Sequence, residues 1–214
     1  NPDAEDVYKR FLNASEDNVL QQNQNERRTC ILIWTKRKFT RILKNDMNGA
    51  VGVYESGMHH PFGSRKKCPF KSIPFIMNVF LDGLIAFYAA RAKFGEQKHW
   101  LAIGLESLDI LRKWTKLSAW NFESKLLLCE AEHLFLKDSE QALEKFEASI
   151  KSAHAHRLIH EEGLAYSKLG FYHLANGRKA AAAQSFAKSK RCYYQWGAHT
   201  LVNGMQIVDM ISSA

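Results

Sequence analysis

Residues 141–155 read QALEKFEASIKSAHA, and residues 181–195 read AAAQSFAKSKRCYYQ. A shift of forty positions aligns three pairs of identical or similar residues in these stretches: Ala142 with Ala182, Phe146 with Phe186, and Lys151 with Arg191. Positions four apart lie on one face of a helix. The small alanine lets a partner helix approach closely, and the phenylalanine fills the hollow beside it. The pattern predicts a structural repeat core of Ala142, Phe146, Ala182 and Phe186.

The same shift extends beyond these two stretches. Towards the N-terminus it aligns Cys129 with Leu169, His133 with His173, and Leu134 with Leu174. One further shift reaches Ala89, Phe94 and Ala102, and it weakens at Glu106, where the repeat expects phenylalanine. A two-helix unit of this length cannot bury both of its faces alone, so each unit must stack on a neighbour. We therefore expect an all-α protein built from helical-hairpin repeats.

Glycines and short polar residues mark the expected ends of the helices. Gly95, Gly177 and Gly197 each follow a periodic run, and glycine tolerates the left-handed conformation that ends helices. Asp138 or Ser139 can accept the free amides that open the next helix. The expected helices span residues 75–94, 97–115, 121–137, 139–155, 159–176, 178–196 and 198–212. No stretch of useful length alternates as a strand would.

Aromatic residues gather in CYYQWGAHTLV, residues 192–202, where the last predicted repeat ends. Such rings could read nucleic-acid bases, hold a ligand, or be buried under a following helix. Gly197 would fold that helix back, so that Val202, Met205 and Val208 cover Tyr193 and Trp196. Large aromatic side chains bury the most apolar surface per residue. We therefore include Trp196 in the predicted core.

The chain divides into three parts. Residues 1–26 are a polar N-terminal segment, whose Asn/Gln-rich end at 13–26 is a predicted linker. Residues 27–73 combine a basic helix with an irregular Gly/Pro loop, expected over residues 48–74. Residues 74–214 form the helical-repeat domain. One apolar stripe is expected along the basic helix: Leu32, Thr35, Phe39, Ile42 and Leu43.

A set of motifs runs through residues 75–203: Trp114, Asn121-Phe122 with Lys125, Ala131-Glu132, His160-Glu161-Glu162-Gly163-Leu164-Ala165, and Tyr194-Gln195-Trp196-Gly197-Ala198. Together they resemble the tetratricopeptide-like region of large signalling kinases of bacteria, fungi and algae. In that family a kinase-like domain and an AAA/STAND-type ATPase precede the repeats, and a GAF domain and a histidine kinase often follow. The resemblance implies a short right-handed solenoid within a signal-transduction protein. It transfers no catalytic residue, because no Walker-type, kinase or phospho-acceptor motif occurs here.

The composition is that of a globular protein. Its 214 residues are 46% hydrophobic, which is enough for a sizeable core. The chain does not begin with Met, so we expect a segment of a longer protein, and its polar start lacks the apolar region of a signal peptide. The four cysteines, Cys30, Cys68, Cys129 and Cys192, form no CxxC pair. Scattered thiols are typical of a reducing compartment, and we expect a cytoplasmic protein.

The net charge of +8 is concentrated in the N-terminal third. The cations lie in residues 27–44 (Arg27, Arg28, Lys36, Arg37, Lys38, Arg41, Lys44) and in residues 65–71. They could form a solvated helix face or attract nucleic acid, a membrane surface or an acidic protein. We name Arg37, Arg41 and Lys44 as candidate partner contacts. A binder of nucleic acid or anionic membrane surfaces, acting through 27–44 and 65–71, is the main alternative function.

Histidines supply the remaining candidate sites. In HAHRLIHEE, residues 154–162, His156 and His160 have the spacing of a metal pair on one helix, but the expected break at 157–159 favours a polar turn. His59, His60 and Cys68 could bind a metal or belong to a basic docking loop. His133 and His173 occupy equivalent repeat positions. They should lie on one side of the array, either half-buried or contacting one extended peptide.

The leading interpretation is a non-catalytic protein–protein interaction module whose stacked hairpins present a concave surface. Its partner would be a protein or a neighbouring domain of the same parent chain. No GxSxG or phosphate-binding glycine loop is present, so we predict no enzyme, cofactor or metal. Residues 72–90 are long and apolar enough for a bilayer, but Asp82 at their centre favours a buried helix, and we predict no membrane span.

Overall fold

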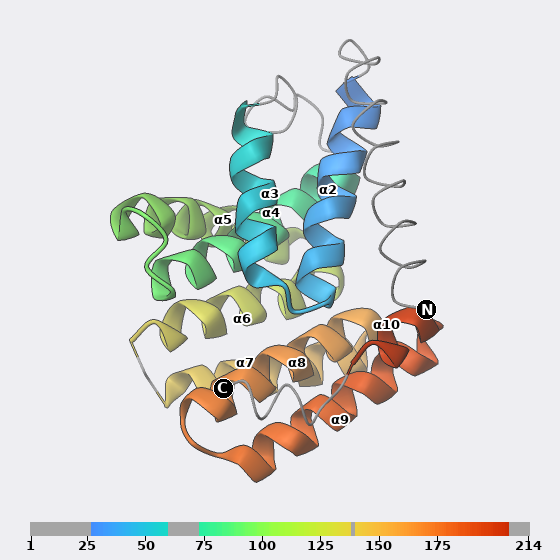
Figure 1. Cartoon of the computed structure of the whole chain (residues 1–214). Helices are drawn as coiled ribbons and strands as arrows, with labels where there is room; N and C mark the ends of the chain where they lie inside the picture. The colour runs from blue at the N-terminus through green and yellow to red at the C-terminus, as the bar shows by residue number, and fades with distance from the viewer. Residues whose placement is uncertain (1–26, 60–72, 138–139, 206–214) are drawn as a thin grey trace, which may run out of the picture.

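In the computed structural model, the described residues, 27–59, 73–137 and 140–205, form helices joined by short turns, with no strand among them (Figure 1). This confirms the all-α prediction. The helices of the described residues are α2 (Arg27–Leu43), α3 (Met47–His59), α4 (Ile73–Arg91), α5 (Gln97–Leu117), α6 (Ala119–Phe135), α7 (Gln141–Ala155), α8 (Ile159–Ala175), α9 (Lys179–Gln195) and α10 (His199–Asn203).

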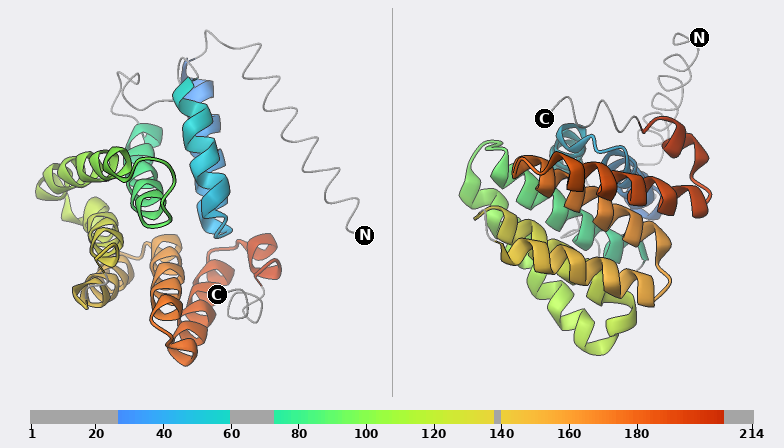
Figure 2. Two further views of the ribbon diagram at one scale, coloured as in Figure 1. Left: turned by 60° about the vertical axis from the view of Figure 1, so that its left-hand side comes forward. Right: turned by 90° about the horizontal axis from the view of Figure 1, so that it is seen from below.

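Helices adjacent in sequence pack as antiparallel pairs: α2 with α3, α4 with α5, α6 with α7, and α8 with α9. Successive pairs also contact each other, through α5 with α6 and α7 with α8. Helices α4 to α9 follow an arc, and the α2–α3 hairpin lies on its inner side (Figure 2, left). The arc brings residues that are far apart in sequence to a common inner face.

Two of the three glycines named as helix ends, Gly177 and Gly197, end their helices, whereas α4 ends at Arg91, before Gly95. Arg157, Gly177 and Gly197 follow α7, α8 and α9 at intervals of twenty residues, each with a positive φ between 57° and 87°. The amide of Ala198 donates to the Tyr193 carbonyl across 2.9 Å, and the amides of Arg178 and Leu158 make the same bond one and two helices earlier, respectively. This bond satisfies a carbonyl that the helix end would leave unpaired. Asp138 and Ser139 lie outside the described residues.

The expected irregular loop over 48–74 is wrong for its first half, which forms α3. Asp46 opens this helix, because its side-chain oxygen Oδ1 accepts the Gly49 amide at 2.8 Å. Met47, Ala50 and Val51 then bury one helical face. Three glycines in α3 lower the apparent helix propensity and obscure this pattern. The remainder of the loop, residues 60–72, and the linker at 13–26 lie outside the described residues.

The α2–α3 hairpin is attached to α4 by buried polar contacts. Lys38 Nζ lies 2.6 Å from Asp82 Oδ1, and the two side chains are 3% and 2% exposed. One turn away, the Asn78 side chain donates to Thr35 Oγ1 at 2.7 Å. Because a buried charge requires a partner, Asp82 determines where α2 can pack.

Helix α4 is the most enclosed element. It contacts α2, α3, α5 and α6, and most of its residues from Asn78 to Ala90 are buried. By length and composition alone it could cross a membrane, and 67% of its most apolar window is buried inside the protein. The core helix of a soluble protein meets the same criterion.

The alanines and phenylalanines of the repeat pattern are fully buried: Ala142, Phe146, Ala182 and Phe186. Phe146 packs against Phe135 and Tyr172, with ring centroids 6.5 and 5.6 Å away. Phe186 lies on Phe171 and directly over Gly170, where a Cβ atom would overlap its ring. Both rings therefore fill the space between two neighbouring helices.

Two predicted core positions are wrong. Leu32 is 57% exposed, because the buried face of α2 is formed by Cys30, Ile31 and Trp34 instead. Trp196 is 40% exposed, because it caps the end of α9 rather than facing the core.

The burial predicted for Tyr193 is confirmed: its side chain is fully buried in a cluster with Val202 and Met205. The third predicted covering residue, Val208, lies outside the described residues. The final helix was expected over 198–212, and the structure describes it as α10, with residues 206–214 again outside.

Replacing Phe186→Ala should lower the free energy of unfolding by about 3–5 kcal/mol, because it opens a cavity over Gly170. Denaturant unfolding at pH 7 measures this. Tyr194→Ala is the control: it removes a 60% exposed aromatic from the same helix and should change stability by less than about 0.5 kcal/mol. Equal effects of the two substitutions would contradict the packing described.

Asp82→Asn should cost about 3–5 kcal/mol, because it leaves the Lys38 ammonium buried without a charge partner. The double variant Lys38→Met/Asp82→Leu should recover most of that loss. Breaking the exposed Arg41–Asp46 pair with Arg41→Met provides the contrast and should cost less than about 1 kcal/mol. The same denaturant measurement compares all three, and a double variant as unstable as Asp82→Asn would refute this account.

Candidate functional site

His133 and His173, the histidines at equivalent repeat positions, pack against neighbouring side chains and do not project into solvent. His133 stacks on Phe87 of α4, with ring centroids 5.0 Å apart, and His173 is only 9% exposed. Burial lowers the pKa of both imidazoles, and Lys137 and Arg178 respectively lower it further. Neither ring lines a described pocket. This arrangement does not support the prediction that the two histidines contact one extended peptide.

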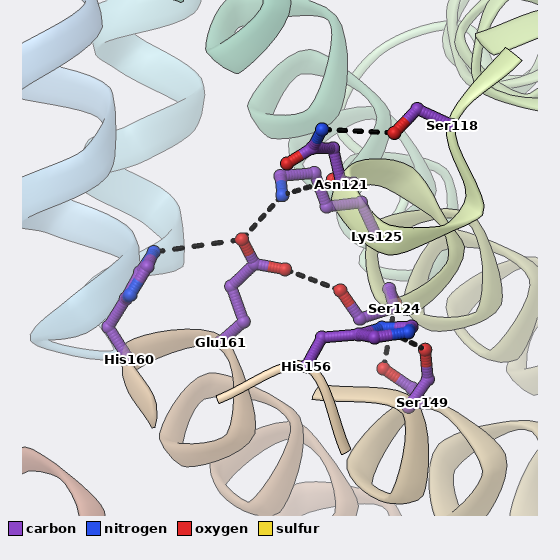
Figure 3. A network of polar contacts seen from close by, with 9 residues as sticks. Ser118, Asn121, Ser124, Lys125, Ser149, His156, His160 and Glu161 are labelled. Atoms are coloured by element: carbon purple, nitrogen blue, oxygen red, sulfur yellow. Dashed lines mark hydrogen bonds and ion pairs between the residues drawn. The ribbon is translucent and has the colours of Figure 1, made fainter. Parts of the chain in front are cut away.

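The sequence HAHRLIHEE forms a polar turn with a buried ion pair (Figure 3). Helix α7 ends at Ala155 and α8 begins at Ile159, so His156 and His160 do not share a helix face. Glu161 reaches back to α6, where its carboxylate binds Lys125 Nζ and Ser124 Oγ, each at 2.5 Å. Lys125 also donates to the Asn121 carbonyl. The network fastens α8 to α6, and both oxygens of the Glu161 carboxylate are used within the protein.

Two tryptophan–histidine pairs lie at this same end of the stack. Trp120 of α6 packs on His156, with ring centroids 4.7 Å apart, and His160 stacks on Trp196 at 5.1 Å. Trp120 lies forty positions before His160, and His156 lies forty positions before Trp196. The two pairs therefore occupy equivalent repeat positions, with tryptophan and histidine exchanged. Within the described residues no group of three or more His, Cys, Asp or Glu could hold a metal ion. His59 ends α3, whereas His60 and Cys68 lie outside the description.

The basic helix has fewer available charges than its sequence suggests. Lys38 is buried against Asp82, and Arg41 pairs with Asp46. Arg37 lies over the Trp34 ring, with its guanidinium carbon 5.3 Å from the ring centroid. Lys44 is exposed. The second basic segment, residues 65–71, lies outside the described part of the chain, as do the side chains of Arg27 and Arg28.

A pocket of about 390 Å³ lies where the α2–α3 turn meets the inner face of the arc. It is lined by the turn and the ends of three helices: Asn45, Met47, Tyr88, Arg91, Glu132, Phe135, Lys168, Phe171, Leu174 and Ala175. The turn is held over α8 by Ser167, whose hydroxyl donates to Asn45 Oδ1 at 2.7 Å. Pockets of this size accommodate small ligands.

Lys168 is the unusual residue of this pocket. It is 4% exposed, and its ammonium donates to the Met47 sulfur at 3.0 Å, which is a weak acceptor. Burial lowers its pKa to about 8, although the nearby Glu132 acts in the opposite direction. No carboxylate lies within ion-pair distance of it among the described residues. A buried ammonium without an anion destabilises the fold.

The other charged groups of the pocket form an ion pair, and the Tyr88 hydroxyl has a hydrogen-bond partner. Arg91 Nη1 lies 2.8 Å from Glu132 Oε2, and its guanidinium carbon is 4.0 Å from the Phe135 ring centroid. The Tyr88 hydroxyl donates to Asn48 Oδ1 at 2.7 Å. The pocket thus combines aromatic walls with one ammonium that has no anionic partner in the described part of the chain.

Sequence reasoning missed Lys168. A forty-residue shift aligns it with Leu128, which is a core residue. A lysine inside an otherwise apolar repeat position was the available signal. Desolvated titratable groups in pockets are candidates for functional sites.

Comparisons with protein families, with curated proteins and with solved structures found no match to this chain. The candidate site therefore rests on its own geometry.

Lys168→Met should raise the free energy of unfolding at pH 7 by up to about 3 kcal/mol, because it removes a charge that the fold desolvates. The pKa of Lys168 is lower in the folded chain, about 8 against 10.5, so the unfolded chain binds more protons between these values. The wild type should therefore gain stability as the pH rises from 8 to 10.5, and the variant should lack that gain. Lys188→Met, which removes an exposed lysine of α9, is the matched control. Denaturant unfolding across this pH range distinguishes the two variants. Identical pH profiles of the wild type and Lys168→Met would contradict the burial of a charged Lys168.

Proposed function

We propose that this chain is a non-catalytic helical-repeat module for protein–protein interaction and a segment of a larger signal-transduction protein. The observation that carries the proposal is the exposure of three apolar or aromatic side chains at one end of the helix stack. Leu117, Trp120 and Tyr194 are 84%, 58% and 60% exposed. They lie where α6 begins and where α5 and α9 end.

Recurring local structure supports the repeat interpretation. Helices α6 and α8 begin and end forty positions apart, as do the ends of α7 and α9. Ser149 donates to the Ser124 carbonyl and Ser189 to the Gly163 carbonyl, so the second helix of each hairpin approaches the first in the same way. The α4–α5 hairpin departs from this period, consistent with the weakening of the pattern at Glu106. A short right-handed solenoid of two regular hairpins and a divergent one is the architecture we propose.

The partner surface differs from the concave one that the sequence suggested. The α2–α3 hairpin already covers part of the inner side of the arc. The end of the stack at which α6 begins carries the two tryptophan–histidine pairs as well as the three exposed side chains Leu117, Trp120 and Tyr194. Large exposed apolar groups at neighbouring sites are typical of protein-contact surfaces, and tryptophan and tyrosine dominate their binding energy.

The resemblance to signalling kinases gives this module a place in a parent chain. In that family the array lies between an ATPase and an output module, and we propose the same relay here, in the cytoplasm, by analogy. The alternative, a binder of anionic polymers or membrane surfaces, has less support, because Lys38 and Arg41 are engaged with carboxylates. It predicts affinity for nucleic acid or anionic vesicles that falls steeply with salt.

A photo-crosslinking amino acid at position 120 tests the proposal. It should link the chain to one protein in extracts of the source cells, or to a neighbouring domain when the parent chain is used. The same group at Leu105, which is 42% exposed on α5, should not give that product.

The identified protein is then titrated against purified variants. Trp120→Ala should weaken binding by about 2 kcal/mol or more, as expected for a buried tryptophan contact, and Leu105→Ala should leave it unchanged. Equal crosslinking at both positions, or unchanged affinity of Trp120→Ala, would rule out this surface.

A further inference from the structure

We propose that the pocket around Lys168 binds a small organic carboxylate with an apolar or aromatic body. The pocket lies at the opposite end of α6 and α8 from Trp120, so this site goes beyond the proposed protein contact. Its three walls come from the α2–α3 turn, the end of α4, and the second halves of α6 and α8.

The charges of the pocket favour a single negative charge on the ligand. Lys168 and Arg91 are cationic and Glu132 is anionic, and Arg91 and Glu132 neutralise each other across 2.8 Å. Lys168 is left with one thioether acceptor for an ammonium that has three donors. One carboxylate placed against its Nζ would supply the missing charge and acceptors. A ligand with more charges would bring unpaired anions into an apolar site.

The remaining walls favour an apolar body. Phe135, Phe171 and Leu174 line the pocket, and the guanidinium face that lies on Phe135 is already in use. Two polar side chains nearby are already engaged, since Asn45 Oδ1 accepts from Ser167 and the Tyr88 hydroxyl donates its proton to Asn48. A sugar or a polar peptide would therefore find few free partners here, whereas a hydrocarbon or aromatic ring would be buried against similar groups.

The position of Met47 gives the ligand a structural effect. Met47 is the first residue of α3, directly after the α2–α3 turn, and Lys168 belongs to α8. A carboxylate bound to Nζ beside the Met47 sulfur would contact both the N-terminal hairpin and the C-terminal half of the arc. Because the ligand would bind the form in which the hairpin is packed on α8, binding should stabilise that packing.

Isothermal titration of the whole chain at pH 7 with benzoate, 4-phenylbutyrate and octanoate tests the site. At least one should bind at one equivalent, and the neutral 4-phenylbutyramide should bind at least tenfold more weakly than its acid. Lys168→Met should weaken binding at least tenfold. Lys188→Met, which removes a lysine from the open groove beside Tyr166, should bind as the wild type does. Absence of binding by all three acids, an amide that binds equally, or an unaffected Lys168→Met would overturn the proposal.

Two further readouts separate charge recognition from misfolding of the variant. The affinity of the wild type should fall as the pH rises above about 8, where Lys168 loses its proton, and circular dichroism checks that each variant is helical. In the wild type, bound 4-phenylbutyrate should protect Lys168 from acetylation by acetic anhydride, and Lys188 should remain unprotected. Equal labelling of Lys168 with and without a binding acid would contradict the site. Crosslinking at position 120 is unaffected by either result, so the two proposals fail separately.

Discussion

An aspartate in the middle of the most enclosed helix sets the main constraint on this fold. Asp82 cannot reach water, and its carboxylate is neutralised by Lys38 from α2. The N-terminal hairpin must therefore pack beside α4, on the inner side of the arc, and its turn reaches α8. The Lys168 pocket and the occupied inner face both follow from this one ion pair. Buried pairs of this kind add little net stability, but they select a single arrangement when the alternative leaves a charge unpaired.

Local rules predicted most of the helical architecture. Glycines 177 and 197 end their helices because they adopt the left-handed conformation that other residues avoid. Arg157 adopts it as well, at a position where no glycine signals a break, and the polar sequence around it was the available evidence. Helix α3 could not be recognised in this way. Its glycines suggested a loop, and only the buried face formed by Met47, Ala50 and Val51 stabilises it as a helix.

The candidate site was less accessible to sequence reasoning than the fold. Histidines attracted attention because their chemistry is versatile, yet His133 and His173 are packed among aromatic rings. Lys168 attracted none, because a lysine in a long helix is usually solvated. Its burial depends on Met47, which is 121 positions away in the chain, and no local pattern records such a contact. Residues with the strongest functional case are those whose environment is produced by tertiary packing.

The contact between Asn45 and Ser167 also has a consequence for biosynthesis. A ribosome releases the N-terminal hairpin long before α8 exists, so the contact of its turn with α8 cannot form until more than a hundred further residues have been made. Contacts of such long range close slowly. Until they form, Lys168 remains hydrated and the inner face of the nascent arc is open to chaperones or to a premature partner.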